Sequence, residues 1–230
     1  MDPDELYTLR AQYWLGHYNL CLDEAKSVAR RPMAANLKVE REEFVLRSQL
    51  ALKQYDKVIR DSDGEDRTPG IRAINLRAKY DSPSTPATTK TEILTSLHTL
   101  LSSPTGSSST TLQLLSSQTF LSAGSSHTEA ALECVHLGLT MEHLAQTVQI
   151  YIKINRLDLA RSQLDLMKQA DEEAVLTQLC GVYLHAATGR SEVNEAVHML
   201  GSLTEQYGPS LMLLNCMAVV MLVGERYDEA

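Results

Sequence analysis

The stretch Asn155-Arg156-Leu157-Asp158-Leu159-Ala160 decides the fold, because its pattern recurs along the chain. A polar turn is followed by an aromatic residue or Leu, then by an acidic or polar residue, and two positions later by a small residue or Val. The other clear copies are Gly16-His17-Tyr18-Asn19-Leu20-Cys21, Lys53-Gln54-Tyr55-Asp56-Lys57-Val58 and Glu225-Arg226-Tyr227-Asp228-Glu229-Ala230. Two weaker copies end at Ala130 and Ala196.

The spacing of these copies indicates the class of repeat. Their last residues stand at 21, 58, 130, 160, 196 and 230, and successive positions differ by 37, 72, 30, 36 and 34. The difference of 72 corresponds to two units, one of which has lost its copy. Self-similarity near 34 residues is typical of tetratricopeptide helix-turn-helix arrays. The sequence therefore predicts an all-α, tetratricopeptide-like helix-turn-helix superhelical solenoid.

The pattern also assigns roles within each helix pair. We expect Asn155 to be the N-cap of a second helix, with Asp158 in its first turn, and Tyr18, Tyr55, Leu157 and Tyr227 to wedge between paired helices. Ala130, Ala160, Ala196 and Ala230 should let two backbones approach closely. Apolar stripes with helical spacing are expected at Leu144, Thr147, Val148 and Tyr151; at Leu157, Ala160, Arg161, Leu164 and Met167; and at Leu214, Met217, Ala218 and Met221. Within the second stripe, Arg161 must turn toward the rim.

These signals predict a single solenoid over residues 1–230, built from about seven helix pairs. The expected pairs are 4–29, 37–60, 70–102, 110–137, 141–169, 172–206 and 210–230, the last one truncated. Ala230 stands where a second helix should begin, so we expect a piece of a longer protein that is poorly soluble alone.

Residues 82–128 differ in composition from the rest, because Ser and Thr dominate and charge nearly vanishes. The segments 81–86 and 102–109 are predicted to be exposed loops, and Ile93, Leu94, Leu97, Leu100 and Leu101 keep helical spacing between them. We interpret 82–128 as a degenerate repeat with loops. A solvated linker and a phosphorylation target remain alternatives.

Composition and charge narrow the class of function. The formal net charge is -8, and residues 129–230 carry all of that excess, with 6 basic and 14 acidic groups. We therefore expect no nucleic-acid partner. The N-terminus lacks a secretory signal, and the most apolar stretch, 211–223, is shorter than a membrane-spanning helix. The four cysteines lack metal or redox spacing, so the sequence favours a cytoplasmic protein.

The sequence contains none of the common catalytic or nucleotide-binding motifs. His136 and His143 are better interpreted as surface residues than as metal ligands, and 171–173 as carboxylates that compensate a helix dipole. Cys180 and Cys216 fit a core better than a nucleophile. The prediction is therefore a non-enzymatic protein without metal or cofactor.

Two sets of segments resemble those of a known family and occur along the chain in the same order as in that family. The first is 147–161 with 164–167, 171–179 and 187–189; the second is 4–6, 13–21, 23–25, 210–215 and 224–230. Together they resemble the epsilon subunit family of coatomer, the coat of COPI vesicles. The resemblance is strong over 144–230, moderate over 4–80 and weak over 82–128.

The resemblance implies a non-catalytic coat subunit with a tetratricopeptide solenoid. It implies binding to the C-terminal domain of the coatomer alpha subunit, contact with other coatomer subunits, and only indirect contact with membrane through the coat. The implied location is the cytoplasm, peripheral on Golgi membranes and COPI-coated vesicles, in Golgi-to-ER retrograde and intra-Golgi transport. The family continues beyond residue 230 by about two repeats.

Repeat geometry places five residues on the concave, partner-binding face: Gln149, Ile152, Met212, Asn215 and Val219. Ile152 and Val219 fit the core equally well. A different tetratricopeptide adaptor, such as a chaperone-type module that grips a C-terminal carboxylate, is the alternative function. It would need Lys, Arg and Asn converging from neighbouring first helices. An enzyme with a thiol or carboxylate site is a third hypothesis.

Overall fold

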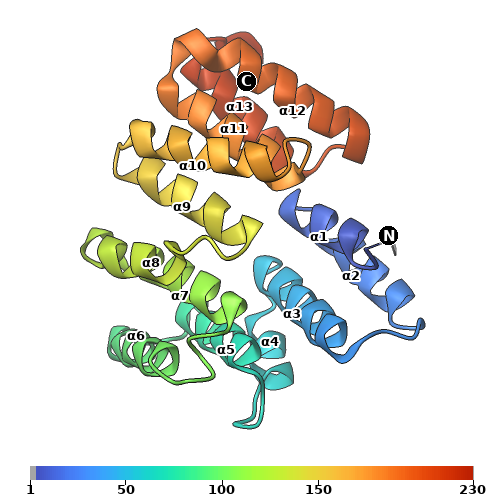
Figure 1. The fold of residues 1–230 in the computed structure, drawn as a ribbon, viewed down its shortest axis with the longest axis vertical. Helices are drawn as coiled ribbons and strands as arrows, with labels where there is room; N and C mark the ends of the chain where they lie inside the picture. The colour runs from blue at the N-terminus through green and yellow to red at the C-terminus, as the bar shows by residue number, and fades with distance from the viewer. Residues whose placement is uncertain (1–3, 230) are drawn as a thin grey trace. The chain divides into compact units, whose positions relative to one another are not determined.

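A computed structural model describes residues 4–229, which form an all-α structure without any strand in that range (Figure 1). The predicted fold class is confirmed. The helices are α1 (Tyr7–Trp14), α2 (Tyr18–Val28), α3 (Ala35–Ala51), α4 (Tyr55–Asp61), α5 (Pro69–Asp81), α6 (Ala87–Leu101), α7 (Thr110–Ala123), α8 (Thr128–Val135), α9 (Met141–Lys153), α10 (Leu157–Ala170), α11 (Val175–Thr188), α12 (Val193–Tyr207) and α13 (Leu211–Val223). Short 3-10 turns are η1 (Ser125–His127), η2 (Arg190–Glu192) and η3 (Tyr227–Glu229).

The helices fall into two compact units. The first holds residues up to Tyr13 and Tyr18–Val135, and the second holds Trp14–His17 and the residues from His136 onward. The helices form pairs, such as α3 with α4 and α9 with α10. Within each unit, the second helix of one pair packs on the first helix of the next pair, as α4 packs on α5 and α10 on α11. Successive first helices also touch, namely α3, α5 and α7 in one unit and α9, α11 and α13 in the other. Such neighbour-only packing is characteristic of helical repeats. One continuous solenoid over 1–230 stays a prediction.

The recurring turn has a common backbone geometry. Lys53, Asn155 and Glu225 occupy the same place in their copies and all have positive φ, at 60°, 57° and 57°. The N–H of Asn155 donates to the carbonyl of Ile152 at 3.0 Å, and the next N–H reaches back to Tyr151 at 2.8 Å. This is the Schellman arrangement that ends a helix. The prediction that Asn155 caps the following helix is therefore wrong, because the left-handed residue closes α9 and the N-cap of α10 is Arg156.

Small residues sit where the paired helices approach. Ala160 and Ala196 are fully buried, as are Cys21 and Val58 at the same place in other copies. In the weak copy predicted to end at Ala130, the buried small residue is its neighbour Ala131, because Ala130 is only half-buried while Ala131 is fully buried. Ala230, the remaining predicted small residue and the expected start of a second helix, lies outside the described residues.

The core of the second unit is built from α9, α10 and α11. Its buried residues are Ala145, Val148, Ala160, Leu164, Met167, Cys180 and Leu184. Two of the predicted stripes therefore supply much of this core. Tyr151 and Leu157 lie at its edge and are half-buried, as expected of residues wedged between paired helices.

The Ser/Thr-rich segment contains two well-formed helices, α6 and α7. Ser116, Ser117 and Thr119 of α7 are fully buried, so part of its hydroxyl content lies inside the first unit rather than in solvent. The Thr119 hydroxyl donates to the carbonyl of Leu115 at 2.6 Å, which lowers the cost of its burial. Residues 102–109 join the two helices and form the one long connection within the segment.

The last helix, α13, differs from the predicted stripe. Met221 is buried and Met217 and Ala218 are half-buried, but Leu214 is 55% exposed. The buried side is instead centred on Leu213 and Val220. Tyr227, predicted to wedge between helices, is 66% exposed. Across residues 4–229, no helix combines the length and the apolar character needed to cross a bilayer.

Candidate functional site

The five residues predicted to bind a partner lie on two first helices of the second unit. Gln149 and Ile152 belong to α9, and Met212, Asn215 and Val219 belong to α13. The helix α11 contacts both α9 and α13 and stands between the two groups. Nothing in the geometry tests whether these residues bind a partner, so the site remains a prediction.

Exposure divides this set. Gln149 and Asn215 are exposed and Val219 is 55% exposed, so their side chains are available to a partner. Ile152 is half-buried against the core of α9, α10 and α11, which is the alternative that the sequence left open. Met212 is also half-buried. Accessible surface is therefore concentrated at Gln149 on α9 and at Asn215 and Val219 on α13.

The exposed apolar surface of α13 is larger than the predicted residues on that helix. Leu211 is 81% exposed, and Leu214, Val219 and Leu222 are 55%, 55% and 52% exposed. The helix carries no charged residue on any side. Contiguous exposed apolar surface is a common feature of protein interaction sites. The absence of charge from 211–223 is the sequence signal for this surface.

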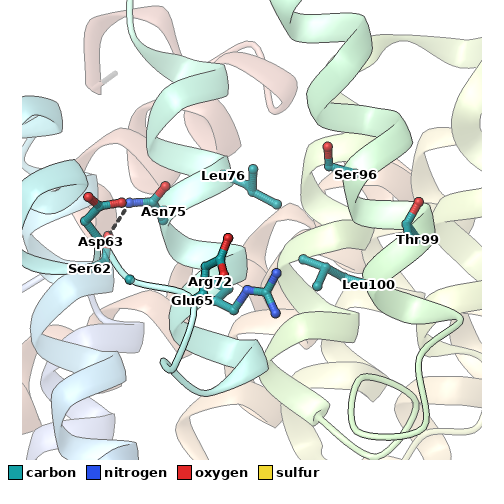
Figure 2. Close-up of a pocket in the computed structure, with 10 residues that line it drawn as sticks. Ser62, Asp63, Glu65, Arg72, Asn75, Leu76, Ser96, Thr99 and Leu100 are labelled. Atoms are coloured by element: carbon teal, nitrogen blue, oxygen red, sulfur yellow. Dashed lines mark hydrogen bonds between the residues drawn. The ribbon is translucent and has the colours of Figure 1, made fainter.

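A polar cleft lies in the first unit, between α5, α6 and the connection that precedes α5 (Figure 2). It has a volume of about 570 Å³ and is lined by Ser62, Asp63, Gly64, Glu65, Arg72, Asn75, Leu76, Ser96, Thr99 and Leu100. Figure 2 shows the Arg72 guanidinium extending toward Leu100 of α6. Asn75 closes one side by donating to the carbonyl of Ile59 and to the Ser62 hydroxyl, both at 2.9 Å. The cleft can hydrogen-bond a small polar group, and sequence reasoning did not find it.

Ionic contacts in the second unit are structural. Arg161 of α10, predicted only to turn toward the rim, donates to Glu192 at 2.8 Å and to Thr188 at 3.1 Å. These hydrogen bonds from Arg161, and the contact with His185, lower the pKa of the Glu192 carboxyl. Arg156 holds the Asp158 carboxylate with bonds of 2.9 and 2.8 Å, which lowers the pKa of Asp158 to about 2. Asp158 therefore lies in the first turn of α10, as expected.

The candidate reactive groups occupy unreactive surroundings. Burial raises the pKa of the Cys180 and Cys134 thiols to about 12, and it also raises the pKa of Cys216. Within residues 4–229, no group of three or more His, Cys, Asp or Glu side chains is placed to hold a metal ion. His136 is exposed as expected, but His143 is 1% exposed and is not a surface residue.

Gly138, Gly189 and Gly208 follow helices and have positive φ, at 60°, 101° and 85°. They stand at or just after helix ends and do not form phosphate-binding loops. Paired helices and neighbour-only packing together define the chain as an α-helical repeat protein.

Comparison with known proteins gives the family. The family model described as coatomer epsilon subunit matches residues 2–230, so the chain belongs to the coatomer epsilon subunit family and has the role of a coatomer subunit. It is 35% identical to coatomer subunit epsilon-2 of Arabidopsis thaliana, over 99% of this chain and 75% of that protein. It is 34% identical to coatomer subunit epsilon-1 of Oryza sativa subsp. japonica, over 100% of this chain and 76% of the relative. A more distant relative, coatomer subunit epsilon of Dictyostelium discoideum, is 26% identical over 100% of this chain and 77% of its own length.

Proposed function

We propose that this chain is a non-enzymatic structural subunit of the COPI coat that binds the C-terminal domain of the coatomer alpha subunit. The observation that carries the proposal is the match to the coatomer epsilon subunit family over residues 2–230. The fold supports it, because stacked helical hairpins present a broad surface made by successive first helices, and such surfaces bind protein segments or domains.

We further propose that the partner contacts Gln149, Ile152, Met212, Asn215 and Val219. Val219 offers an exposed apolar side chain, and the exposed amides of Gln149 and Asn215 belong to α9 and α13, the two first helices that contact α11. An apolar centre with a polar surround is the usual composition of a protein interface. Ile152 and Met212, half-buried beside these residues, would supply the supporting floor of the contact.

In this role the protein acts in the cytoplasm, peripherally on Golgi membranes and COPI-coated vesicles, in Golgi-to-ER retrograde and intra-Golgi transport. It meets the membrane only through the coat. Fluorescence of the tagged chain should overlap that of another coat subunit at the Golgi. Diffuse fluorescence in cells whose coat is assembled would contradict the proposed location.

Isothermal titration of the 230-residue chain with the purified C-terminal domain of the alpha subunit tests the partner. Val219→Glu should weaken binding at least about tenfold, since it places a charge at a desolvated apolar contact. Leu166→Glu is the matched control, because Leu166 is 47% exposed on the second helix α10. Failure of the unchanged chain to bind would reject the partner. Equal binding by the chain and by Val219→Glu would reject the surface.

A further inference from the structure

The polar cleft of the first unit contains charged groups that the fold leaves without partners (Figure 2). Among residues 4–229, the side chains of Asp63, Glu65 and Arg72 form no hydrogen bond or ion pair. Asp63 and Glu65 are exposed on the connection between α4 and α5, and Arg72 is half-buried on α5. The lining of the cleft therefore offers one guanidinium and two carboxylates to a ligand.

The connection that carries the two carboxylates is held in place by hydrogen bonds. Near its start, the Asn75 side chain donates to the Ser62 hydroxyl at 2.9 Å. From its far end, the Arg67 guanidinium donates back to the carbonyl of Asp61 at 3.1 Å. Gly64 lies between the two carboxylates in sequence and has a φ of 129°, which side chains rarely adopt. Because the connection is already ordered, binding a ligand there requires little further ordering.

The wall of the cleft that α6 contributes offers hydrogen-bond acceptors. The Ser96 hydroxyl donates to the carbonyl of Glu92 at 2.9 Å. The Thr99 hydroxyl donates to the carbonyl of Thr95 at 3.0 Å. Each hydroxyl proton is thus used within the helix, and the lone pairs of the two exposed hydroxyls remain for a ligand. Together with the two carboxylates they make the cleft rich in acceptors, and the Arg72 guanidinium is its free donor.

An acceptor-rich cleft with a free guanidinium fits a ligand that carries both an ammonium and a carboxylate. A lysine ammonium has three donors and no acceptor, which matches the carboxylates and hydroxyls of the lining. A guanidinium binds a carboxylate through two parallel hydrogen bonds. Figure 2 shows Leu76 and Leu100 projecting into the cleft from α5 and α6, where they offer apolar contact to the methylene chain of a lysine.

We propose that the cleft binds a segment of a partner protein that carries a lysine and an acidic residue close together. The lysine ammonium lies between Asp63, Glu65 and the hydroxyls of α6, and the acidic side chain pairs with Arg72. The cleft volume of about 570 Å³ is within the range of ligand-binding sites and has room for two side chains. None of the lining residues belongs to the five of the proposed partner surface, so this proposal does not rest on the proposed function.

Binding at such a site is weak and ionic. Exposed ion pairs each contribute little, so we expect a dissociation constant in the millimolar range that increases with added salt. Nuclear magnetic resonance of the isotope-labelled 230-residue chain measures it, by titration with blocked alanine-based peptides that contain one lysine and one glutamate, adjacent or a few residues apart, in either order. At least one of these mixed peptides should shift the signals of Gly64, Asn75 and Ser96. Peptides with two lysines or two glutamates at the same spacing should shift them less.

Variants of the chain assign the contacts. Arg72→Gln and Glu65→Gln should each weaken binding of the mixed peptide about fivefold, which is the upper range for an exposed ion pair. Arg60→Gln is the matched control, because the Arg60 side chain is 76% exposed on α4 and does not line the cleft. It should leave binding unchanged, and far-ultraviolet circular dichroism should show that every variant is folded.

Several outcomes would overturn the proposal. In one, no mixed peptide shifts the signals of the lining residues, or a peptide with two lysines binds equally well. In another, Arg60→Gln weakens binding as much as Arg72→Gln, since general charge and not the cleft would then decide binding. Free lysine and free glutamate that bind together as tightly as the mixed peptide would show that the ligand is not a protein segment.

Discussion

The guanidinium of Arg161 and the carboxylate of Glu192 meet at 2.8 Å and join α10 to the short turn before α12. The other carboxylate oxygen of Glu192 lies 2.7 Å from the ring of His185 on α11. Three successive helical elements of the second unit are therefore tied at one glutamate.

Replacing this glutamate should have a pH-dependent effect. The pKa of Glu192 is lowered by its hydrogen bonds with Arg161 and His185. The ionised Glu192 carboxylate therefore stabilises the folded chain fully above the ordinary glutamate pKa of about 4.3. This stabilisation is lost as the pH falls through the lowered pKa of the folded state. Near pH 6, Glu192→Gln should lower the free energy of unfolding by less than about 1 kcal/mol, because the Arg161 and Glu192 side chains are partly exposed. Urea midpoints should differ between chain and variant at pH 6, and the difference should be smaller at pH 3. A constant difference at both pH values would contradict the ionic origin.

Two glycines should respond to alanine in opposite directions. Gly201 lies within α12 and an added Cβ meets nothing within 4 Å, so Gly201→Ala should stabilise the fold by about 0.5–1 kcal/mol. Gly189 has φ of 101° after α11, a conformation that side chains rarely adopt, so Gly189→Ala should cost about 1–3 kcal/mol. Thermal melts of both variants against the unchanged chain provide the measurement. Equal shifts in one direction would show that backbone conformation does not decide these positions.

Enlarging the small residue at the helix contact should damage packing. Ala160 is fully buried in the core of the second unit, so Ala160→Leu should destabilise it by about 1–3 kcal/mol. Ala187→Leu is the matched control on an exposed position of α11 and should stay within about 0.5 kcal/mol. Chemical denaturation of both variants distinguishes them. Similar losses in the two would mean that helix propensity, and not close approach, determines the outcome.

The buried thiol of Cys180 should be chemically silent in the folded chain. Its pKa of about 12 leaves almost no thiolate at pH 8, so native labelling by a disulfide reagent should be about a thousandfold slower than for a free thiol. Comparing the chain with Cys180→Ser isolates this residue, and unfolding in urea should restore a fast rate. Rapid native labelling of Cys180 would indicate an accessible, activated thiol and favour the enzyme hypothesis.

Local sequence predicted the elements that local chemistry controls. Each clear copy of the recurring pattern marks a turn between two helical elements. The residues Lys53, Asn155 and Glu225 of three copies share nearly the same positive φ. The expected apolar stripes on α9 and α10 supply residues of the core. Each stripe occupies one side of its helix and polar residues occupy the other, so the sequence pattern alone indicates which side is buried. Pro69 begins α5 after Thr68, whose hydroxyl accepts a hydrogen bond from Ile71, as the preference of proline for the first turn predicts.

The errors occurred where several residues compete for one role. Asn155 suits a helix N-cap and a left-handed turn equally well by composition, and the Schellman bonds of α9 decide for the turn. At the weak copy, either of two adjacent alanines could take the buried place, and Ala131 does. On α13 every side is apolar, so periodicity could not select the buried face, and Leu214 was assigned to the wrong side.

Sequence alone therefore determined the all-α class, the repeat, the turns and the family resemblance, because each depends on short-range pattern or on residue identity. Only the tertiary structure decided which side of α13 faces outward, that Ile152 leans on the core while Val219 is exposed, and that a cleft opens beside Arg72. The physical reason is that burial depends on which neighbouring helices pack against a residue. The sequence shows that a side chain is apolar, but it does not show whether a neighbouring helix covers that side chain.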